Sequence, residues 1–245
     1  MNFVGSKGGA GVAQWIVSTM PYHTHYVEAF LGRGVVLDFK KPASQLNMAI
    51  EIDPSTIADY QRRQAESETA TGSRTLIFGD ALTILPILAT NRDWLIYCDP
   101  PYLGTTRSCN RDYYRHEMRT AAEHERFLSI ASSIDANVMI SGYAADLYDR
   151  HLRGWRTSTF WTVNRAGKRV EEKLWMNFDP PQSLHDTRFF GNGFTDRQRV
   201  KRKVMRWTRK LATMPAGERQ AIMDALLNIQ EPKTEMTLLH RGGAL

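Results

Sequence analysis

The stretch Trp94-Leu95-Ile96-Tyr97-Cys98-Asp99-Pro100-Pro101-Tyr102 joins a short apolar run to a proline-rich turn. An apolar run of this length, bounded by turn-forming residues, is typical of a buried strand. The two prolines fix the backbone and remove two N–H donors, so their carbonyls remain as acceptors. Asp99 therefore ends a strand with a carboxylate beside a carbonyl acceptor and the ring of Tyr102. This combination suits a planar base that carries an exocyclic amine.

A second decisive stretch is Tyr26-Val27-Glu28-Ala29-Phe30-Leu31-Gly32-Arg33-Gly34-Val35-Val36, which predicts a strand, a tight turn and the start of a helix. Glycines permit positive φ and let a ligand approach the backbone. A helix N-terminus that follows a strand is suited to bind a nucleotide or a carboxylate. The spacing is not G-x-G-x-x-G, so a dinucleotide site matches poorly. A purely structural turn is the alternative.

Residues 46–50 and 75–78 predict two further strands, and acids follow both. Glu51 and Asp53 come roughly twenty residues after the glycine turn, where an acid can accept hydrogen bonds from ribose hydroxyls. Asp80 follows the other strand. Capping of the next helix is the competing explanation for Asp53 and for Asp80.

The rest of the first 180 residues alternates between helical and extended patterns. We expect helices over residues 12–20, 56–64 and 120–134, and strands over residues 138–143, 157–163 and 171–177. The last two strands, joined by a short polar turn, predict an antiparallel hairpin. These patterns predict an α/β domain over residues 1–180.

The tail differs in charge from the body. The chain has 245 residues and a net charge of +6, yet residues 195–211 alone carry +7, which leaves −1 elsewhere. Thr195 is expected to cap a helix whose apolar stripe ends at Leu211, and Pro215 to begin a second helix, forming a helical hairpin. Residues 181–245 thus predict a basic helical extension. Its charge favours a polyanionic partner, although a solubilising cap on the body is the alternative.

Several classes are disfavoured by composition. There is no apolar run long enough to span a membrane and no apolar leader at the start. Two cysteines, Cys98 and Cys109, make neither a disulfide framework nor a zinc set. We therefore expect a cytoplasmic protein with no membrane contact and no metal.

Asp99-Pro100-Pro101-Tyr102 resembles motif IV of the amino-methylating S-adenosylmethionine (AdoMet) methyltransferases. Gly5-Ser6-Lys7 resembles the Gly-Gly-Lys element of Dam-type enzymes, and the turn at residues 29–34 resembles their Pro-Phe-x-Gly-x-Gly, with Ala29 in place of proline. The chain is similar to Dam-type (D12 class) DNA adenine-N6 methyltransferases over residues 5–178, in the small form often carried by phages. The resemblance implies a class I AdoMet-dependent methyltransferase fold: a Rossmann-like mixed sheet with helices on both faces.

The resemblance also implies roles for single residues. The catalytic motif would be Asp99, Pro100, Pro101 and Tyr102. AdoMet would be bound by Lys7, Glu28, Phe30, Gly32, Gly34, Glu51, Asp53, Asp80 and Asp99, with Glu51 preferred over Asp53 as the ribose ligand. Ser141 and Tyr143 would lie beside the target base.

Candidate DNA contacts come from two basic segments. Residues 104–120 interleave basic and aromatic side chains, which suits phosphate contact and base stacking, although a solvated loop is the alternative. The candidates there are Arg107, Arg111, Tyr113, Tyr114 and Arg115. Those in the extension are Arg199, Lys201, Arg202, Lys203 and Arg206.

The implied reaction is methyl transfer from AdoMet to the N6 amine of adenine in double-stranded DNA, with the base flipped out. Cytosine N4 methylation uses the same chemistry, but serine commonly replaces the aspartate there. RNA adenine methylation stays open, as does a non-catalytic DNA-binding protein on the same fold. Only residues 54–98 separate the acid after the second strand from the motif, so the usual target-recognition insertion is lacking. We therefore expect site-specific methylation without predicting the site, in a phage or restriction-modification setting.

Overall fold

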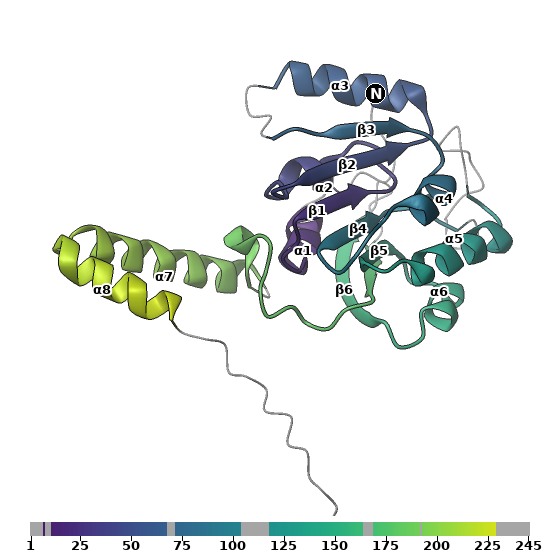
Figure 1. Cartoon of the computed structure of the whole chain (residues 1–245). Helices are drawn as coiled ribbons and strands as arrows, with labels where there is room; N and C mark the ends of the chain where they lie inside the picture. The colour runs from purple at the N-terminus through teal and green to yellow at the C-terminus, as the bar shows by residue number, and fades with distance from the viewer. Residues whose placement is uncertain are drawn as a thin grey trace, which may run out of the picture. The chain divides into compact units, whose positions relative to one another are not determined.

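The computed structural model describes residues 7, 11–67, 72–103, 118–163, 169–191 and 193–228 (Figure 1). The chain divides into two compact units, Met1–Phe190 and Gly191–Leu245. The first unit ends later than the predicted boundary at residue 180 because residues 183–190 pack back onto it. There, Leu184 pairs with Pro21, and the rings of Phe39 and Phe189 stack at 4.6 Å.

The first unit is built on a seven-stranded sheet of order β3-β2-β1-β4-β5-β7-β6. The strands are β1 His25–Glu28, β2 Leu46–Glu51, β3 Thr75–Phe78, β4 Trp94–Cys98, β5 Asn137–Tyr143, β6 Arg156–Val163 and β7 Arg169–Met176. Strands β1 to β5 pair in parallel, whereas β7 runs antiparallel to both β5 and β6. The predicted mixed sheet and its antiparallel ending are confirmed.

Helices cover both faces of this sheet, as predicted (Figure 1). One face carries α1 Val12–Ser18, α2 Val35–Phe39 and α3 Pro54–Ala65; the other carries α4 Ala81–Ile84, the 3-10 turn η1 Leu85–Ile87, α5 Ala121–Ser133 and α6 Asp146–His151. Strand alternation decides which side chains meet which helices. Ile96 packs on the α5 side with Phe127, whereas Tyr97 packs on the α1 side with Ile16.

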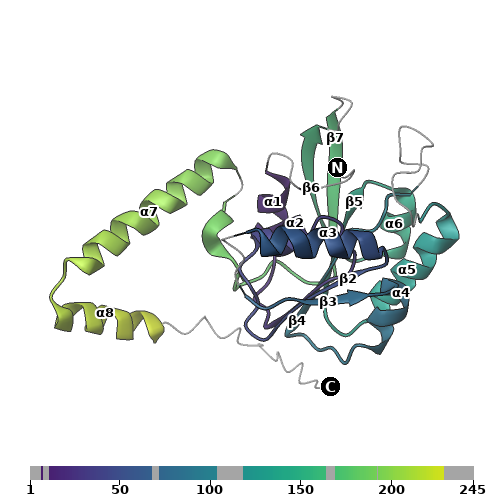
Figure 2. The same cartoon turned by 90° about the horizontal axis from the view of Figure 1, so that it is seen from above.

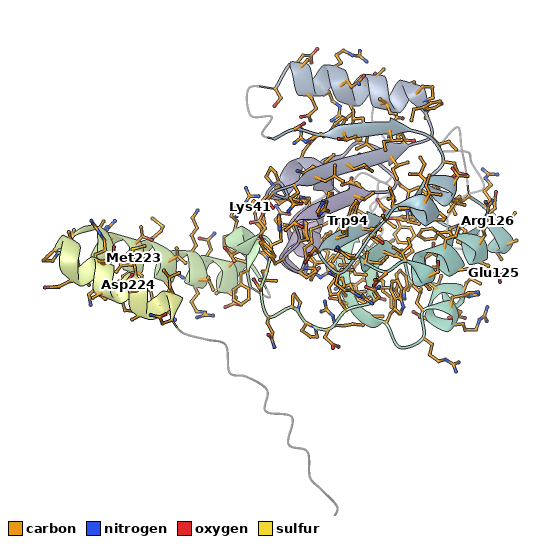
Figure 3. All side chains as sticks on the ribbon, viewed as in Figure 1. Lys41, Trp94, Glu125, Arg126, Met223 and Asp224 are labelled. Atoms are coloured by element: carbon orange, nitrogen blue, oxygen red, sulfur yellow. The ribbon has the colours of Figure 1, made fainter. Side chains whose placement is uncertain are left out.

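Local signals fix where the helices begin. Thr120 caps α5 in a capping box with Glu123, so that the side chain of each bonds the backbone of the other. Asp53 caps α3, and Pro54 occupies its first turn. At the amino-terminal ends of β1 and β4, the rings of His25 and Trp94 stack with centroids 4.5 Å apart. Trp94 is labelled in Figure 3. This stacking leaves the opposite edge, where β1 and β4 end, for the loops that carry the sequence motifs.

The second unit contains α7 Phe194–Ala212 and α8 Ala216–Leu227. The predicted cap at Thr195 is wrong: α7 begins two residues earlier than that cap implies, with Gly193 at the cap position and no side-chain capping bond. Pro215 precedes α8, as expected. The two helices spread apart from the turn between them (Figure 2), so they do not pack along their length as a closed hairpin. Several of their apolar residues are exposed, among them Trp207 on α7. Met223 on α8 is another (Figure 3).

Within the described residues, no helix is both long and apolar enough to cross a membrane.

Candidate active site

The glycine turn and Asp99 leave neighbouring strands at the same edge of the sheet. Strand β1 lies between β2 and β4, so the strand order reverses at this point. The backbone N–H of Ala29 donates to the carbonyl of Tyr97 at 2.9 Å, which holds the two strand exits together. In open α/β sheets, ligands bind outside the carboxyl ends of the strands at such a switch point.

The two glycines of the turn serve different purposes. Both adopt left-handed backbone conformations, with φ of 49° at Gly32 and 65° at Gly34. A Cβ on Gly34 would lie 2.4 Å from Cε2 of Tyr60, so packing requires glycine there. A Cβ on Gly32 would meet nothing within 4 Å. The turn therefore presents open space above Gly32, where a ligand can approach the backbone.

Glu51, at the end of β2, ties the neighbouring loops together. Its Oε2 accepts a hydrogen bond from the backbone N–H of Gly32 at 2.9 Å, and its Oε1 accepts from that of Asp53 at 3.0 Å. Glu51 therefore borders the open space above the turn, as a ribose ligand must. A glycine cradle beside a carboxylate fits the nucleoside part of AdoMet.

Helix capping, the competing explanation for two predicted cofactor ligands, is present in the structure. Asp53 accepts from the backbone N–H of Ser55 at 2.9 Å, and Asp80 accepts from that of Leu82 at 2.9 Å. These bonds satisfy the first turns of α3 and α4. A contact to AdoMet remains a prediction for both aspartates.

The side chains of Glu28 and Phe30 both make contacts within the first unit. Glu28 is buried, and the hydroxyl of Tyr26 donates to its Oε2 at 2.9 Å. Burial raises the pKa of Glu28 to about 8. The ring of Phe30 packs edge-on against Phe127, with centroids 5.6 Å apart. Their predicted contacts with AdoMet remain predictions.

Asp99 is held by two donors at one oxygen. Its Oδ1 accepts from Oγ of Ser141 at 2.9 Å and from Nζ of Lys7 at 2.9 Å. The hydroxyl of Tyr97 lies 2.8 Å from the same Ser141 oxygen. Because a serine hydroxyl has one hydrogen and Ser141 donates it to Asp99, Tyr97 must donate to Ser141. Among the described residues, both donors to Asp99 use Oδ1, which leaves Oδ2 for a substrate amine.

A buried polar cluster lies beside Asp99. Nζ of Lys7 contacts Oε2 of Glu172 at 3.3 Å and donates to the hydroxyl of Tyr102, which in turn donates to Glu172 at 3.2 Å. The rings of Tyr102 and Tyr143 lie 4.3 Å apart. The cluster fixes the tyrosine of the motif relative to its aspartate.

The charges in this cluster are strongly coupled. Burial alone would lower the pKa of Lys7, but the carboxylates of Asp99 and Glu172 outweigh it and raise that pKa above its ordinary value. Burial also raises the pKa of Glu172, helped by Asp99 and opposed by Lys7. Lys7 is therefore a permanent cation inside the site.

The structure thus brings together five residues that the sequence singled out: Lys7, Asp99, Tyr102, Ser141 and Tyr143. Ser141 is only 1% exposed, so it supports Asp99 from behind, whereas the sequence predicted a contact with DNA. Pro100 is buried and Pro101 half-buried in the turn between Asp99 and Tyr102.

The other predicted DNA contacts belong to two segments, residues 104–117 and the C-terminal extension. Those between residues 104 and 117 fall outside the described part of the chain: Arg107, Arg111, Tyr113, Tyr114 and Arg115. Those of the extension are exposed on α7: Arg199, Lys201, Arg202, Lys203 and Arg206.

Sequence reasoning missed Glu172. Alternation along β7 places it on the same face as Leu174 and Met176, which are fully buried. The available signal was a charged residue on the strand face that also carries the apolar Leu174 and Met176. The adjacent acid Glu171 obscured it, because sequence alone does not tell which of the two faces inward.

No group of three or more His, Cys, Asp or Glu side chains within the described ranges is arranged to hold a metal ion.

The sheet order, the glycine turn at the switch point and the motif after β4 define the class: a Rossmann-like class I AdoMet-dependent methyltransferase. Residues 58–160, which include Asp99 to Tyr102, match the family of D12 class N6 adenine-specific DNA methyltransferases. This match confirms the predicted family. The match supports AdoMet-dependent methylation of adenine N6 in DNA as the activity.

Solved structures with a similar fold were also found. Magnesium protoporphyrin IX methyltransferase from Synechocystis PCC 6803, with bound SAM, shares 16% identity at a TM-score of 0.46, covering 69% of this chain and 77% of that one. TrmN from Thermus thermophilus shares 14% identity at a TM-score of 0.48, covering 67% of this chain and 47% of that one. At these scores the similarity assigns no substrate. No functionally curated protein matches the sequence.

Proposed function

We propose that Asp99, Pro100, Pro101 and Tyr102 form the catalytic motif and receive a single adenine flipped out of double-stranded DNA. The observation that carries this proposal is the anchoring of Asp99 at the switch point, where Ser141 and Lys7 fix one carboxylate oxygen. An aspartate held this way has its orientation set before substrate arrives, which is the requirement for positioning a reacting amine.

AdoMet would be held at the turn beside this motif. Gly32 would let its nucleoside approach the backbone, and Glu51 would accept hydrogen bonds from its ribose. When bound, AdoMet supplies an electrophilic methyl group on a sulfonium sulfur. Lys7, Glu28, Phe30, Gly34, Asp53 and Asp80 complete the set of residues proposed to shape this pocket.

The residues of the motif act on the adenine amine. Its nitrogen lone pair is delocalised into the ring, so the amine is a poor nucleophile. Oδ2 of Asp99 and the carbonyl of Pro100 would accept its two N–H groups, which favours a tetrahedral nitrogen whose lone pair is free to attack. Asp99 need not remove a proton before the methyl group moves.

The tyrosines would bind the flipped base by its face. Adenine N6 cannot reach Asp99 while it is paired in a duplex, so the base must leave the stack. The ring of Tyr102 is held by Lys7 and Glu172 and packs against Tyr143. A rigid aromatic surface offers the flipped base stacking that replaces what it loses in the duplex.

Helix α7 is proposed to bind the DNA backbone. Eight basic residues and one acid lie between residues 195 and 211, and every residue from 201 to 210 is exposed. Arg202, Arg206, Arg209 and Lys210 line a shallow hollow on this helix together with Met205. Such a surface neutralises phosphates without reading sequence. Recognition of a specific site is assigned instead to the first unit, including residues 104–117.

The test is to incubate the protein with unmethylated duplex DNA and labelled AdoMet, digest the DNA to nucleosides and identify the product by mass spectrometry. We expect N6-methyladenine from the wild type and none from Asp99→Ala. Asp93→Ala is the matched control, because Asp93 is an exposed aspartate at the opposite end of the same strand. N4-methylcytosine as product, or methylation of RNA only, would contradict the proposal.

A further inference from the structure

Two carboxylates, the half-buried Asp99 and the buried Glu172, share the buried ammonium of Lys7 in the proposed catalytic site. Lys7 lies 2.9 Å from Asp99 and 3.3 Å from Glu172, and the side chains of Lys7 and Glu172 are only 5% and 9% exposed. With Lys7 and both acids ionised, this cluster carries one negative charge in excess. In a buried site such an excess acts strongly on neighbouring charges, because little water screens it.

The reaction creates a charge that this excess can stabilise. As the N6 lone pair forms the new N–C bond, the nitrogen becomes positive, while the sulfonium sulfur keeps the electron pair of the broken C–S bond. One N6 proton then leaves to water, and the methylated amine is neutral. Lys7 alone would cancel the charge of Asp99 next to this nitrogen. A second carboxylate restores the negative charge.

We propose that Glu172 is a positioning residue of the transfer site: it holds Lys7 and Tyr102 in place and keeps the cluster net negative, so that the positive charge developing on N6 is stabilised. This inference rests on the proposed role of Asp99. Fixed charges aimed at the place where charge develops are a main source of catalytic power.

The fold gives Glu172 this position. Across the ladder from β7, Glu172 pairs with Tyr143 of β5, whose ring packs on Tyr102. The hydroxyl of Tyr102 accepts from Lys7, because an ammonium only donates, and so it donates to Glu172. The described titratable and charged groups that face Glu172 include Lys7, Asp99, Tyr102 and its cross-strand partner Tyr143. One side chain therefore controls both the lysine and the tyrosine.

The first test is Glu172→Gln, measured by single turnover at saturating AdoMet and DNA so that binding does not enter. Glutamine keeps an acceptor for Lys7 and Tyr102 but removes the charge. We expect the transfer rate to fall on the order of 10- to 100-fold. The AdoMet dissociation constant by calorimetry, and the fluorescence of 2-aminopurine at the target position, should stay near wild type. An unchanged transfer rate would overturn the proposal.

A double variant separates charge from structure. Lys7→Met combined with Glu172→Gln leaves Asp99 as the sole charge of the cluster and so restores its net value. We expect this double variant to transfer faster than Glu172→Gln alone, although it carries one more substitution. If the double variant is slower than the single one, the charge argument is wrong and Glu172 is only structural.

The pH profile provides a further readout. Because the pKa of Glu172 is raised by burial, the single-turnover rate of the wild type should fall as the pH drops through that pKa. Glu172→Gln should lack this decline, and a decline unchanged in the variant would contradict the inference. The proposed function is tested separately: an active Asp99→Ala refutes that function, whereas an unaffected Glu172→Gln refutes only the role of Glu172.

Discussion

The two units of the chain use charge in opposite ways. In the first unit, charged groups such as Lys7 and Glu172 are buried and paired at fixed distances. In the second unit, the basic residues of α7 from Arg199 to Lys210 are all exposed. Salt screens exposed charges and hardly affects buried ones. In the proposed function, attraction of DNA and chemistry on its base therefore rest on separable sets of residues, and we expect that each can be changed alone.

Asp99→Asn should produce the largest effect, and this effect should be confined to methyl transfer, which is assigned to the first unit. An amide keeps the shape of the side chain but loses the charge and one acceptor for the substrate amine. We expect the single-turnover transfer rate to fall by on the order of 10³-fold or more. Measured by fluorescence anisotropy, DNA affinity should match the wild type, and a parallel loss of affinity would contradict the separation.

Gly34→Ala should have the next largest effect, because it destabilises the folded conformation of the glycine turn. The added Cβ would sit 2.4 Å from Tyr60 at a φ of 65°, so both clash and strain oppose it. We expect a loss of roughly 2–3 kcal/mol in the free energy of unfolding, measured by urea denaturation.

Gly32→Ala is the matched comparison for that variant, since its φ is also positive but its Cβ meets nothing. It should cost less stability, yet weaken AdoMet binding in calorimetry. Equal losses of stability in both variants, with AdoMet binding intact, would show that the turn is structural only.

Removing charge from α7 should weaken DNA binding without slowing transfer. In Lys201→Gln/Lys203→Gln/Arg206→Gln we expect roughly tenfold weaker binding at low salt, and a salt dependence whose slope is reduced by about 0.9 for each phosphate that is no longer neutralised. The single-turnover rate at saturating DNA should not change. The control Arg126→Gln/Arg150→Gln/Arg153→Gln removes the same charge from exposed positions near α5 and α6, and it should bind as the wild type does.

The last prediction concerns the acid stability of the first unit and leaves the proposed activity aside. His23 and His185 stack with centroids 3.7 Å apart, and the ring nitrogens His23 Nε2 and His185 Nδ1 are buried without a partner among the described residues. Burial, with His185 and Lys40 nearby, lowers the pKa of His23 to about 2, and burial also lowers the pKa of His185.

In the unfolded chain the histidines have pKa values near 6.5, so they are protonated below that pH, whereas in the folded unit they stay neutral. Lowering the pH below 6.5 therefore favours the unfolded state. Stability should drop by up to about 1.4 kcal/mol per pH unit for each histidine. His23→Phe keeps a ring in the stack and should flatten the dependence of melting temperature on pH between about 6.5 and 5. His151→Gln, at an exposed histidine, should leave the dependence as it is. Melting curves by circular dichroism decide between the two.

Much of the first unit was predictable from its sequence because its signals are local. The apolar runs at residues 75–78 and 94–98 are strands with the expected limits, and Thr120 does begin α5. Asp53 carried two signals, and helix capping is the one observed. The roles of Ser141 and Glu172 depend on which side chains meet across the sheet, and periodicity along one strand does not contain that information. In the second unit, apolar stripes predicted packing between α7 and α8, but a stripe does not specify its partner, and Val204, Trp207 and Leu226 of these stripes remain exposed.

The polar cluster around Asp99 contains residues from the whole length of the first unit. Lys7 stands near the start of the chain, Asp99 follows the fourth strand, and Glu172 comes from β7, which inserts between β5 and β6. During synthesis on the ribosome, the glycine turn after β1 and Glu51 at the end of β2 can form early, whereas the cluster of Lys7, Asp99 and Glu172 requires β7, the last strand of the chain, to enter the interior of the sheet. A nascent chain can therefore form the proposed AdoMet site well before it forms the proposed transfer site.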